Sequence, residues 1–300
     1  MKHSCLTGTG GTCNSNRRRP DFADASAARA RSRIVPAMDH DPWRETDGVY
    51  DDSGMAWSLR SVGPHLHPGS EEATVALAAR AAQYGLKSGG RILEIASALG
   101  APARFVARRF SSTVICVDRD PRMHRALQAA AAVEELSLRC LSVRALTEHL
   151  PLRDGCMDGA WSQDAMCHMD KPAVVQECAR VLRPGAVFAF SDWIARTELS
   201  TAELAMLADL WSFPSLLTIS EYVLLLDSAG FDVLVAEDRT TASSSGAAVA
   251  PPDQAAWEAS FTARFGDEAV ERNRLRTDAW RGLVVAGRGG FGMFIARRRG

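Results

Sequence analysis

Small and acidic residues follow the first two apolar, strand-like runs of the chain. Glu94 lies within the run RILEIAS, and Ala96, Ser97 and Gly100 come after it, where small side chains let a ligand approach the backbone. Asp118 ends the next such run, STVICVD, one strand–helix–strand step later. An acid at that place suits paired hydrogen bonds to the two hydroxyls of a ribose. Each residue alone has an ordinary explanation, packing for the small residues and a helix cap for Asp118, so their joint occurrence is what predicts a ligand site.

A second polar group follows the fourth strand-like run. That run, MDGAWSQDA, ends in Ser162, Gln163 and Asp164, and His168 lies four residues beyond Asp164. If this segment is a helical turn, Asp164 and His168 point to one face. An imidazole titrates near neutral pH and suits the removal of a proton from a nucleophile. The alternative interpretation is a surface histidine near the start of a helix.

The segments that position these residues alternate between strand-like and helical patterns. One predicted helix is stopped by Arg183–Gly185, and another is capped by Ser220 and ended by Gly230. The predicted strands are RILEIAS, STVICVD, LRCLSVRA, MDGAWSQDA, AVFAFSDWI, DVLVAEDRT and GFGMFIARR. This alternation predicts an α/β fold with a doubly wound, mostly parallel seven-stranded sheet, helices on both faces and added helices. Ligands of such sheets bind at the carboxyl ends of the strands.

Composition limits the class of partner. The 300 residues include 35 Lys and Arg and 36 Asp and Glu, for a net charge of −1, which gives no electrostatic basis for binding nucleic acid or a membrane surface. No apolar run approaches the ~20 residues of a membrane span. Cys116, Cys140 and Cys178 lie in apolar runs, which indicates reduced, buried thiols and a cytoplasmic protein. Cys5 and Cys13 lack a second matching pair, so no metal site is predicted.

The chain divides by composition into a tail and one domain. Residues 1–37 are rich in Gly, Ser, Ala and Arg and are predicted to be a disordered tail, while 38–300 form a single domain. A helical segment at about 39–70 and insertions at about 195–225 and 240–283 are expected to lie on the substrate side. None of them carries a motif that identifies the substrate.

Several segments together resemble the class I S-adenosylmethionine-dependent methyltransferases. The resemblance runs roughly from His65 to Phe231 and is most specific in SQDAMCH and VLRPGA. It is closest to small-molecule enzymes such as the sarcosine and dimethylglycine methyltransferases and the phosphoethanolamine methyltransferases. Tocopherol and sterol C-methyltransferases share much of the pattern. The resemblance implies methyl transfer from S-adenosyl-L-methionine to N, C or O of a small molecule.

The resemblance also implies roles for individual residues. The loop Glu94–Gly100 would hold the methionine part of the cofactor, Asp118 the ribose hydroxyls, and Arg119 the edge of the adenine. The residues implied to bind the cofactor are Glu94, Ala96, Ser97, Gly100, Asp118, Arg119, Ala145, Leu146, Ser162 and Gln163.

The resemblance also implies a catalytic pair and side chains that would cover the active site. Asp164 and His168 match the Asp-x-x-x-His that phosphoethanolamine enzymes use for substrate binding and proton removal. Tyr50 and Trp57 would cover the active site. We further expect four aromatic side chains to form a wall that would hold a methylammonium group or a flat ring. The alternative is that they belong to the protein core. They are Trp161, Trp193, Trp211 and Phe213.

The chain departs from the family pattern at three positions. Ala96 and Ala98 stand where the family usually has glycine, and Arg144 stands where it usually has an aspartate beside the adenine. Two other functions therefore stay open. One is a nicotinamide-dependent oxidoreductase, although the GxGxxG fingerprint is missing, and the other is a non-catalytic cofactor-binding module.

Overall fold

The computed structural model describes residues 52–241 and 254–300, all within one compact unit, Trp43–Gly300. The predicted tail 1–37, its Cys5 and Cys13, and Tyr50 lie outside the described residues. So do residues 39–51 of the predicted leading segment and residues 242–253 of the second predicted insertion, while the insertion at about 195–225 is described in full.

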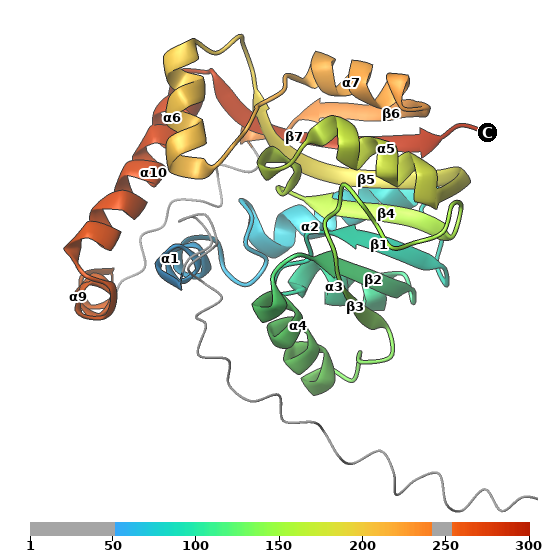
Figure 1. The fold of residues 1–300 in the computed structure, drawn as a ribbon, viewed down its shortest axis with the longest axis horizontal. Helices are drawn as coiled ribbons and strands as arrows, with labels where there is room; N and C mark the ends of the chain where they lie inside the picture. The colour runs from blue at the N-terminus through green and yellow to red at the C-terminus, as the bar shows by residue number, and fades with distance from the viewer. Residues whose placement is uncertain (1–51, 242–253) are drawn as a thin grey trace, which may run out of the picture. The chain divides into compact units, whose positions relative to one another are not determined.

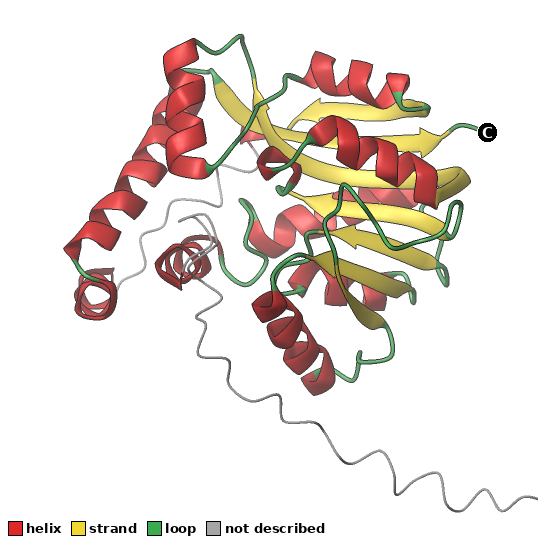
Figure 2. Ribbon diagram, in the orientation of Figure 1, coloured by secondary structure: helices red, strands yellow, loops and turns green. Residues whose placement is uncertain are grey.

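Within the described residues, seven strands form one sheet in the order β3-β2-β1-β4-β5-β7-β6 (Figures 1 and 2). The pairs from β3 to β5 are parallel, while β7 is antiparallel to both β5 and β6. This order confirms the predicted doubly wound, mostly parallel sheet. The strands are β1 Arg91–Ile95, β2 Thr113–Asp118, β3 Cys140–Arg144, β4 Met157–Gln163, β5 Leu182–Ala195, β6 Phe231–Asp238 and β7 Gly289–Arg298.

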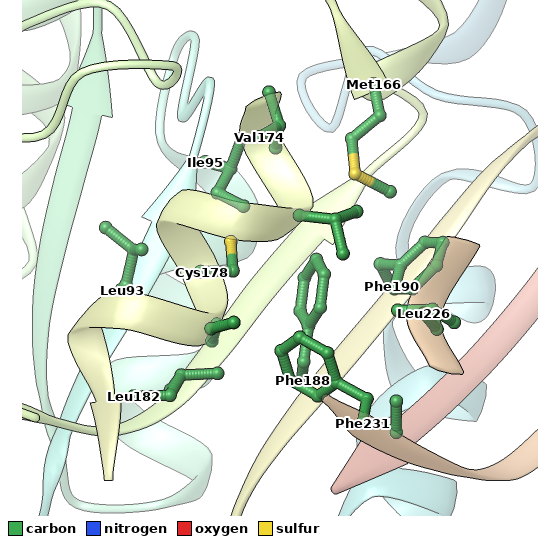
Figure 3. Packing of buried hydrophobic residues seen from close by; sticks show 14 of the residues in the cluster. Leu93, Ile95, Met166, Val174, Cys178, Leu182, Phe188, Phe190, Leu226 and Phe231 are labelled. Carbon is green, nitrogen blue, oxygen red and sulfur yellow. The ribbon is translucent and has the colours of Figure 1, made fainter. Parts of the chain in front are cut away.

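Helices cover both faces of the sheet, each with its own apolar cluster. One cluster joins the sheet to α2 (Ser70–Gln83), α3 (Ala101–Arg109) and α4 (Pro121–Val133). The other joins it to α5 (Lys171–Val181) and α7 (Ile219–Ser228). Figure 3 shows this second cluster, in which side chains of α5 and α7 pack against Phe188 and Phe190 of β5. Both sheet faces are therefore buried, which is why the strands read as near-continuous apolar runs.

Four further helices pack together beyond the end of β5 (Figure 1). They are α1 (Asp52–Val62), α6 (Thr201–Trp211), α9 (Gln254–Phe265) and α10 (Asp267–Val285). Two helices, α9 and α10, thus occupy most of the predicted insertion at about 240–283 and are separated at Gly266, which has φ 84°. None of the helices in the described ranges is both long and apolar enough to span a membrane.

Two local predictions are corrected by the structure. The helix before VLRPGA ends at Val181, and Arg183–Gly185 belong to β5 instead of a loop, because Leu182 already pairs with Met157. The cap of α7 is Thr218 and not Ser220: the Thr218 side chain accepts a hydrogen bond from the Glu221 N–H, and the Glu221 carboxylate accepts one in return from the Thr218 N–H. A Thr-x-x-Glu capping box competes better for the helix start than a serine already inside the first turn.

The capping assignment predicts a difference between two neighbouring substitutions. We expect Thr218→Ala to lower the free energy of unfolding by about 1 kcal/mol, because a backbone N–H loses its partner. The matched control Ser220→Ala, at an exposed side chain, should change it by less than ~0.5 kcal/mol. Urea unfolding of the two variants measures this, and a larger loss for Ser220→Ala would contradict the assignment.

Candidate active site

A cleft lies at the carboxyl ends of β1, β2 and β4. Parallel pairing sets this geometry, because Ile95 of β1 is in register with Val117 of β2 and Ser162 of β4. The residues that follow these three positions therefore meet at one edge of the sheet. The cleft is lined by Pro64–Leu66, Glu94–Gly100, Pro102, Asp118–Asp120, Met123, Ala145–Glu148, Gln163–Ala165, His168 and Met169.

The loop after β1 keeps the backbone conformation that glycine favours, although its residues are alanines. Ala96 has φ 49° and Ala98 has φ 44°, both in the left-handed region. Two hydrogen bonds tie the loop to β2: the Ser97 N–H donates to the Val117 carbonyl (2.9 Å) and the Ala98 N–H to Asp118 Oδ2 (2.9 Å). Left-handed geometry costs an L-residue roughly 1–2 kcal/mol, so these bonds hold a strained loop in place.

Gly100 is the loop position where only glycine fits. Its φ is 70°, and a Cβ built there would lie 2.5 Å from side-chain carbons of Leu127 in α4. The resulting turn starts α3 at Ala101 and lets α4 pack close beside it. This position, unlike Ala96 and Ala98, therefore requires glycine.

Four buried polar atoms around the cleft have no hydrogen-bond partner among the described residues. They are Glu94 Oε2, Ser97 Oγ, Gln163 Nε2 and Asp164 Oδ1. Buried polar groups are satisfied in the great majority of native structures. Four such atoms on one cleft therefore indicate a polar ligand that bonds to them.

Burial perturbs the acids of the cleft. It raises the pKa of Glu94 well above its usual range. Burial also raises the pKa of Asp118. The hydrogen bonds that its carboxylate accepts from the Asp120 and Ala98 N–H groups partly offset this effect. A ligand that donates hydrogen bonds or carries positive charge would relieve this cost.

Asp164 and His168 both line the cleft, but they do not share a helical turn. Asp164 has φ 51° and precedes a short 3-10 helix, Met166–His168, so the predicted common helix face is wrong. Burial, and secondarily the charge of Asp192, raises the pKa of Asp164 to about 8. Burial lowers the pKa of His168 to about 3. At neutral pH the imidazole is neutral and the carboxyl is poised near its titration point.

The structure brings together nearly all of the residues predicted to bind the cofactor. The exception is Ser162, which is completely buried within β4, because alternate side chains of a strand point to opposite faces and Gln163 takes the cleft side. Arg144 does not line the cleft, and its Nε–H donates to the Arg119 carbonyl (3.1 Å).

Sequence reasoning missed two parts of the wall. One is the loop Pro64–Leu66, and the other is the pair Thr147–Glu148 beyond β3. The turn signal HPG after Leu66 marks a loop, but nothing in the sequence says that this loop folds over the strand ends.

The aromatic side chains form core and not a wall of the cleft. Trp193 packs against Trp211, Phe213 and Trp280 at ring-centroid distances of 5.0, 5.4 and 4.3 Å. Trp161 is completely buried, and none of the four predicted rings lines the cleft.

The Trp57 side chain also packs away from the cleft, so it does not cover it. Its ring packs on Trp257 and Phe261 at 5.2 and 5.3 Å, and its Nε1–H donates to Thr277 Oγ1. The described residues contain no group of three or more His, Cys, Asp or Glu side chains placed to hold a metal ion.

A second cleft meets the first at Asp164, which lines both. It lies between the start of α2, β5 and β7, and its polar lining includes Glu72, Ser191 and Arg239. Ser191 Oγ is buried, and its hydrogen bond to the Asp164 carboxyl acts against the effect of burial on the pKa of that acid.

Comparison with known proteins identifies a methyltransferase domain within the chain. Residues 93–190 match a family model described as a methyltransferase domain. The chain is 31% identical over 157 residues to Methyltransferase GfsG of Streptomyces halstedii, a match that covers 51% of this chain and 56% of that protein. The chain thus spans about half the length of such curated relatives.

Solved structures share the fold over a larger part of the chain. A structure described as a sarcosine dimethylglycine methyltransferase from Galdieria sulphuraria superposes with TM-score 0.73 at 22% identity, covering 83% of this chain and 97% of that one. The phosphoethanolamine N-methyltransferase 2 of Haemonchus contortus, in complex with S-adenosyl-L-methionine, gives TM-score 0.70 at 19% identity, covering 84% of this chain and 58% of that one. These likenesses concern the fold.

The chain contains a methyltransferase domain, and its fold is that of S-adenosylmethionine-dependent methyltransferases. Within that class it is similar to the sarcosine/dimethylglycine and phosphoethanolamine N-methyltransferases.

The strained loop after β1 predicts that two alanine-to-glycine substitutions do not lower the free energy of unfolding. We expect Ala96→Gly and Ala98→Gly to leave the free energy of unfolding unchanged or to raise it by up to ~1 kcal/mol. Relief of left-handed strain offsets the extra entropy that glycine gives the unfolded chain. The control Ala129→Gly, at an exposed position within α4, should lower it by about 1 kcal/mol. Chemical denaturation distinguishes these results, and equal losses at all three positions would contradict the strained loop.

Proposed function

We propose that the protein transfers a methyl group from S-adenosyl-L-methionine to a nucleophilic N, C or O atom of a small molecule. The observation that carries the proposal is the set of four unpartnered polar atoms around a cleft whose loop is tied to Asp118. The methyltransferase domain and the cofactor complexes of related folds support it.

The cleft residues suit the three parts of this cofactor. Asp118 would accept hydrogen bonds from the ribose hydroxyls, and Met123 and the Ala145–Leu146 segment, which line the same cleft, would lie beside the adenine. Glu94 and Gln163 would bind the polar groups of the methionine part, Glu94 as an acceptor and Gln163 as a donor. When bound, the cofactor supplies an electrophilic methyl group, so the protein's task is chiefly alignment.

The second cleft is the proposed acceptor side. It meets the cofactor cleft at Asp164, and Ser191 and Arg239 supply a hydroxyl and a positive charge to orient a polar acceptor. Similar proteins carry names that specify dimethylglycine, phosphoethanolamine and sterol acceptors, so the similarity supports a small molecule without selecting one.

Asp164 is the proposed proton acceptor for a nucleophile that must lose a proton. It is shared by both clefts and its Oδ1 is without a partner among the described residues. Its pKa of about 8 matches proton removal near neutral pH, whereas the pKa of His168, about 3, makes that imidazole a weak base. His168 then has the role of a neutral hydrogen-bonding group that orients the acceptor.

The proposed setting is the cytoplasm, with a small molecule as partner. The five cysteines within the described ranges are free, and four of them are buried. The balance of 35 basic and 36 acidic side chains favours neither nucleic acid nor membrane as a partner.

The cofactor assignment predicts a loss of binding on removal of one charge. We expect Asp118→Asn to weaken S-adenosylhomocysteine binding by about 10–100-fold, because charge-assisted hydrogen bonds to the ribose are worth roughly 1.5–3 kcal/mol. Asp154→Asn, at an exposed carboxylate paired with Arg180, is the control and should bind normally. Calorimetry with S-adenosylhomocysteine and with NAD measures both; tighter binding of NAD would favour the oxidoreductase alternative.

The base assignment predicts the pH dependence of turnover. With an acceptor from a screen of amines and phenols, kcat should rise with pH, pass half its maximum near pH 8 and level off above that, as Asp164 loses its proton. Asp164→Asn should remove that rise and lower kcat by about 10²–10⁴-fold. His168→Gln should keep the rise, since His168 is already neutral above about pH 4. Loss of the rise in His168→Gln alone would reverse the two roles, and binding without any transfer would favour a non-catalytic module.

A further inference from the structure

A buried hydrogen-bond chain lies directly behind the Gln163 amide. The indole Nε1–H of Trp161 donates to Gln163 Oε1 at 3.1 Å, and Thr74 Oγ1 lies 3.1 Å from the same oxygen. Trp161 and Thr74 are both completely buried. Neither side chain lines the cleft, whereas Gln163 does.

Trp161 fixes which end of the amide faces the cleft. An indole N–H can only donate a hydrogen bond, so the atom beside it must be the amide oxygen and not the NH2 group. The Gln163 NH2 group then lies on the other side of the amide, buried and without a partner among the described residues. The cleft thereby presents a hydrogen-bond donor at the end of β4.

The same chain ties the loop of residues 63–69 to this amide. Thr74 Oγ1 lies 2.9 Å from His65 Nδ1 and 3.1 Å from His67 Nε2. Burial lowers the pKa of His67 to about 4, so its ring is neutral, and its Nδ1 faces the Pro68 carbonyl, which only accepts. His67 Nε2 is then an acceptor and competes with Gln163 Oε1 for the single Thr74 proton. Trp161 is therefore the firmer determinant of the amide orientation.

The sheet order indicates which ligand group the donor meets. The order β2-β1-β4 puts Asp118 and Gln163 on opposite sides of the β1 loop. With the ribose at Asp118 and the adenine beside Ala145–Leu146, on the β3 side of the sheet, the amino-acid part of the proposed cofactor would extend the other way, toward β4. Its strongest hydrogen-bond acceptor is the carboxylate.

We propose that Trp161 is a positioning residue that holds the Gln163 NH2 group as a donor to the carboxylate of the cofactor's amino-acid part. Thr74 and His67 extend the same arrangement to the loop that carries His65 into the cleft wall. The inference rests on the proposed cofactor and names how this chain recognises one end of it.

Two probes that differ in one part of the molecule test the proposal. S-Adenosylhomocysteine carries the amino-acid part, and 5′-methylthioadenosine has the adenine, ribose and thioether but no carboxylate. Calorimetry with both probes gives a ratio of affinities for each variant. We expect Gln163→Glu to weaken S-adenosylhomocysteine by at least tenfold, because a carboxylate replaces the donor, and 5′-methylthioadenosine by less than twofold.

The positioning role has its own variants and controls. Trp161→Phe should weaken S-adenosylhomocysteine by about 3–10-fold and leave 5′-methylthioadenosine within twofold, and Thr74→Val should do the same to a smaller extent. Trp57→Phe removes an indole donor whose partner is Thr277, away from the cleft, and Gln128→Glu makes the amide-to-acid change on an exposed face of α4. Both controls should bind both probes normally.

Each outcome decides between the inference and a simpler alternative. Equal losses for both probes in Gln163→Glu or Trp161→Phe overturn the inference, since they indicate a purely structural role. Failure of the unaltered protein to bind either probe overturns the proposed cofactor and this inference with it. If Trp161→Phe does not fold, the Trp161 indole N–H resonance of the unaltered protein is followed instead: it should shift with S-adenosylhomocysteine and much less with 5′-methylthioadenosine, and equal shifts overturn the inference.

Discussion

Parallel pairing of β2, β1 and β4 is the constraint on which the rest of the site depends. Because Ile95 is in register with both Val117 and Ser162, the next residue of each strand reaches the same edge of the sheet. Most of the cleft lining comes from these three ends or from the loops that leave them, and the loop Pro64–Leu66 and the segment Ala145–Glu148 beyond β3 complete it. The apolar clusters on both faces keep this register, since a slip by one residue would turn Gln163 into the core and Ser162 into the cleft.

The Asp118 carboxylate links the shape of the cleft to its chemistry. One oxygen holds the strained β1 loop through the Ala98 N–H, and the other accepts the Asp120 N–H at the start of α4. The loop therefore keeps its left-handed geometry at Ala96 and Ala98 without the glycines. Hydrogen bonds to β2 thus hold here a conformation that glycine would adopt without strain.

Two buried acids, Asp164 and Asp192, differ in the hydrogen bonds that their carboxyl groups accept. Asp192 accepts hydrogen bonds from the Tyr222 hydroxyl and the Cys167 N–H, although burial still raises its pKa. Lys171, itself buried, donates to the Ser215 carbonyl (2.8 Å) and reduces the effect of burial on Asp192. Like Glu94 in the first cleft, Asp164 has a carboxyl oxygen without a partner among the described residues, and it lies where the two clefts meet, which is consistent with a role toward a ligand.

The sequence by itself determined the alternation of strands and helices, and hence the sheet, because apolar periodicity and turn residues are local signals. It also placed Glu94, Asp118 and Asp164 at strand ends, since parallel strands all end at one edge. Local signals do not record which loop folds back across that edge or which way a strand's final residues turn. Tertiary structure therefore decided that Pro64–Leu66 close the cleft, that Ser162 is buried, and that Trp161 orients an amide instead of facing a ligand. Burial is likewise a property of the whole packed chain, so only the fold gives Asp164 and His168 their opposite pKa shifts.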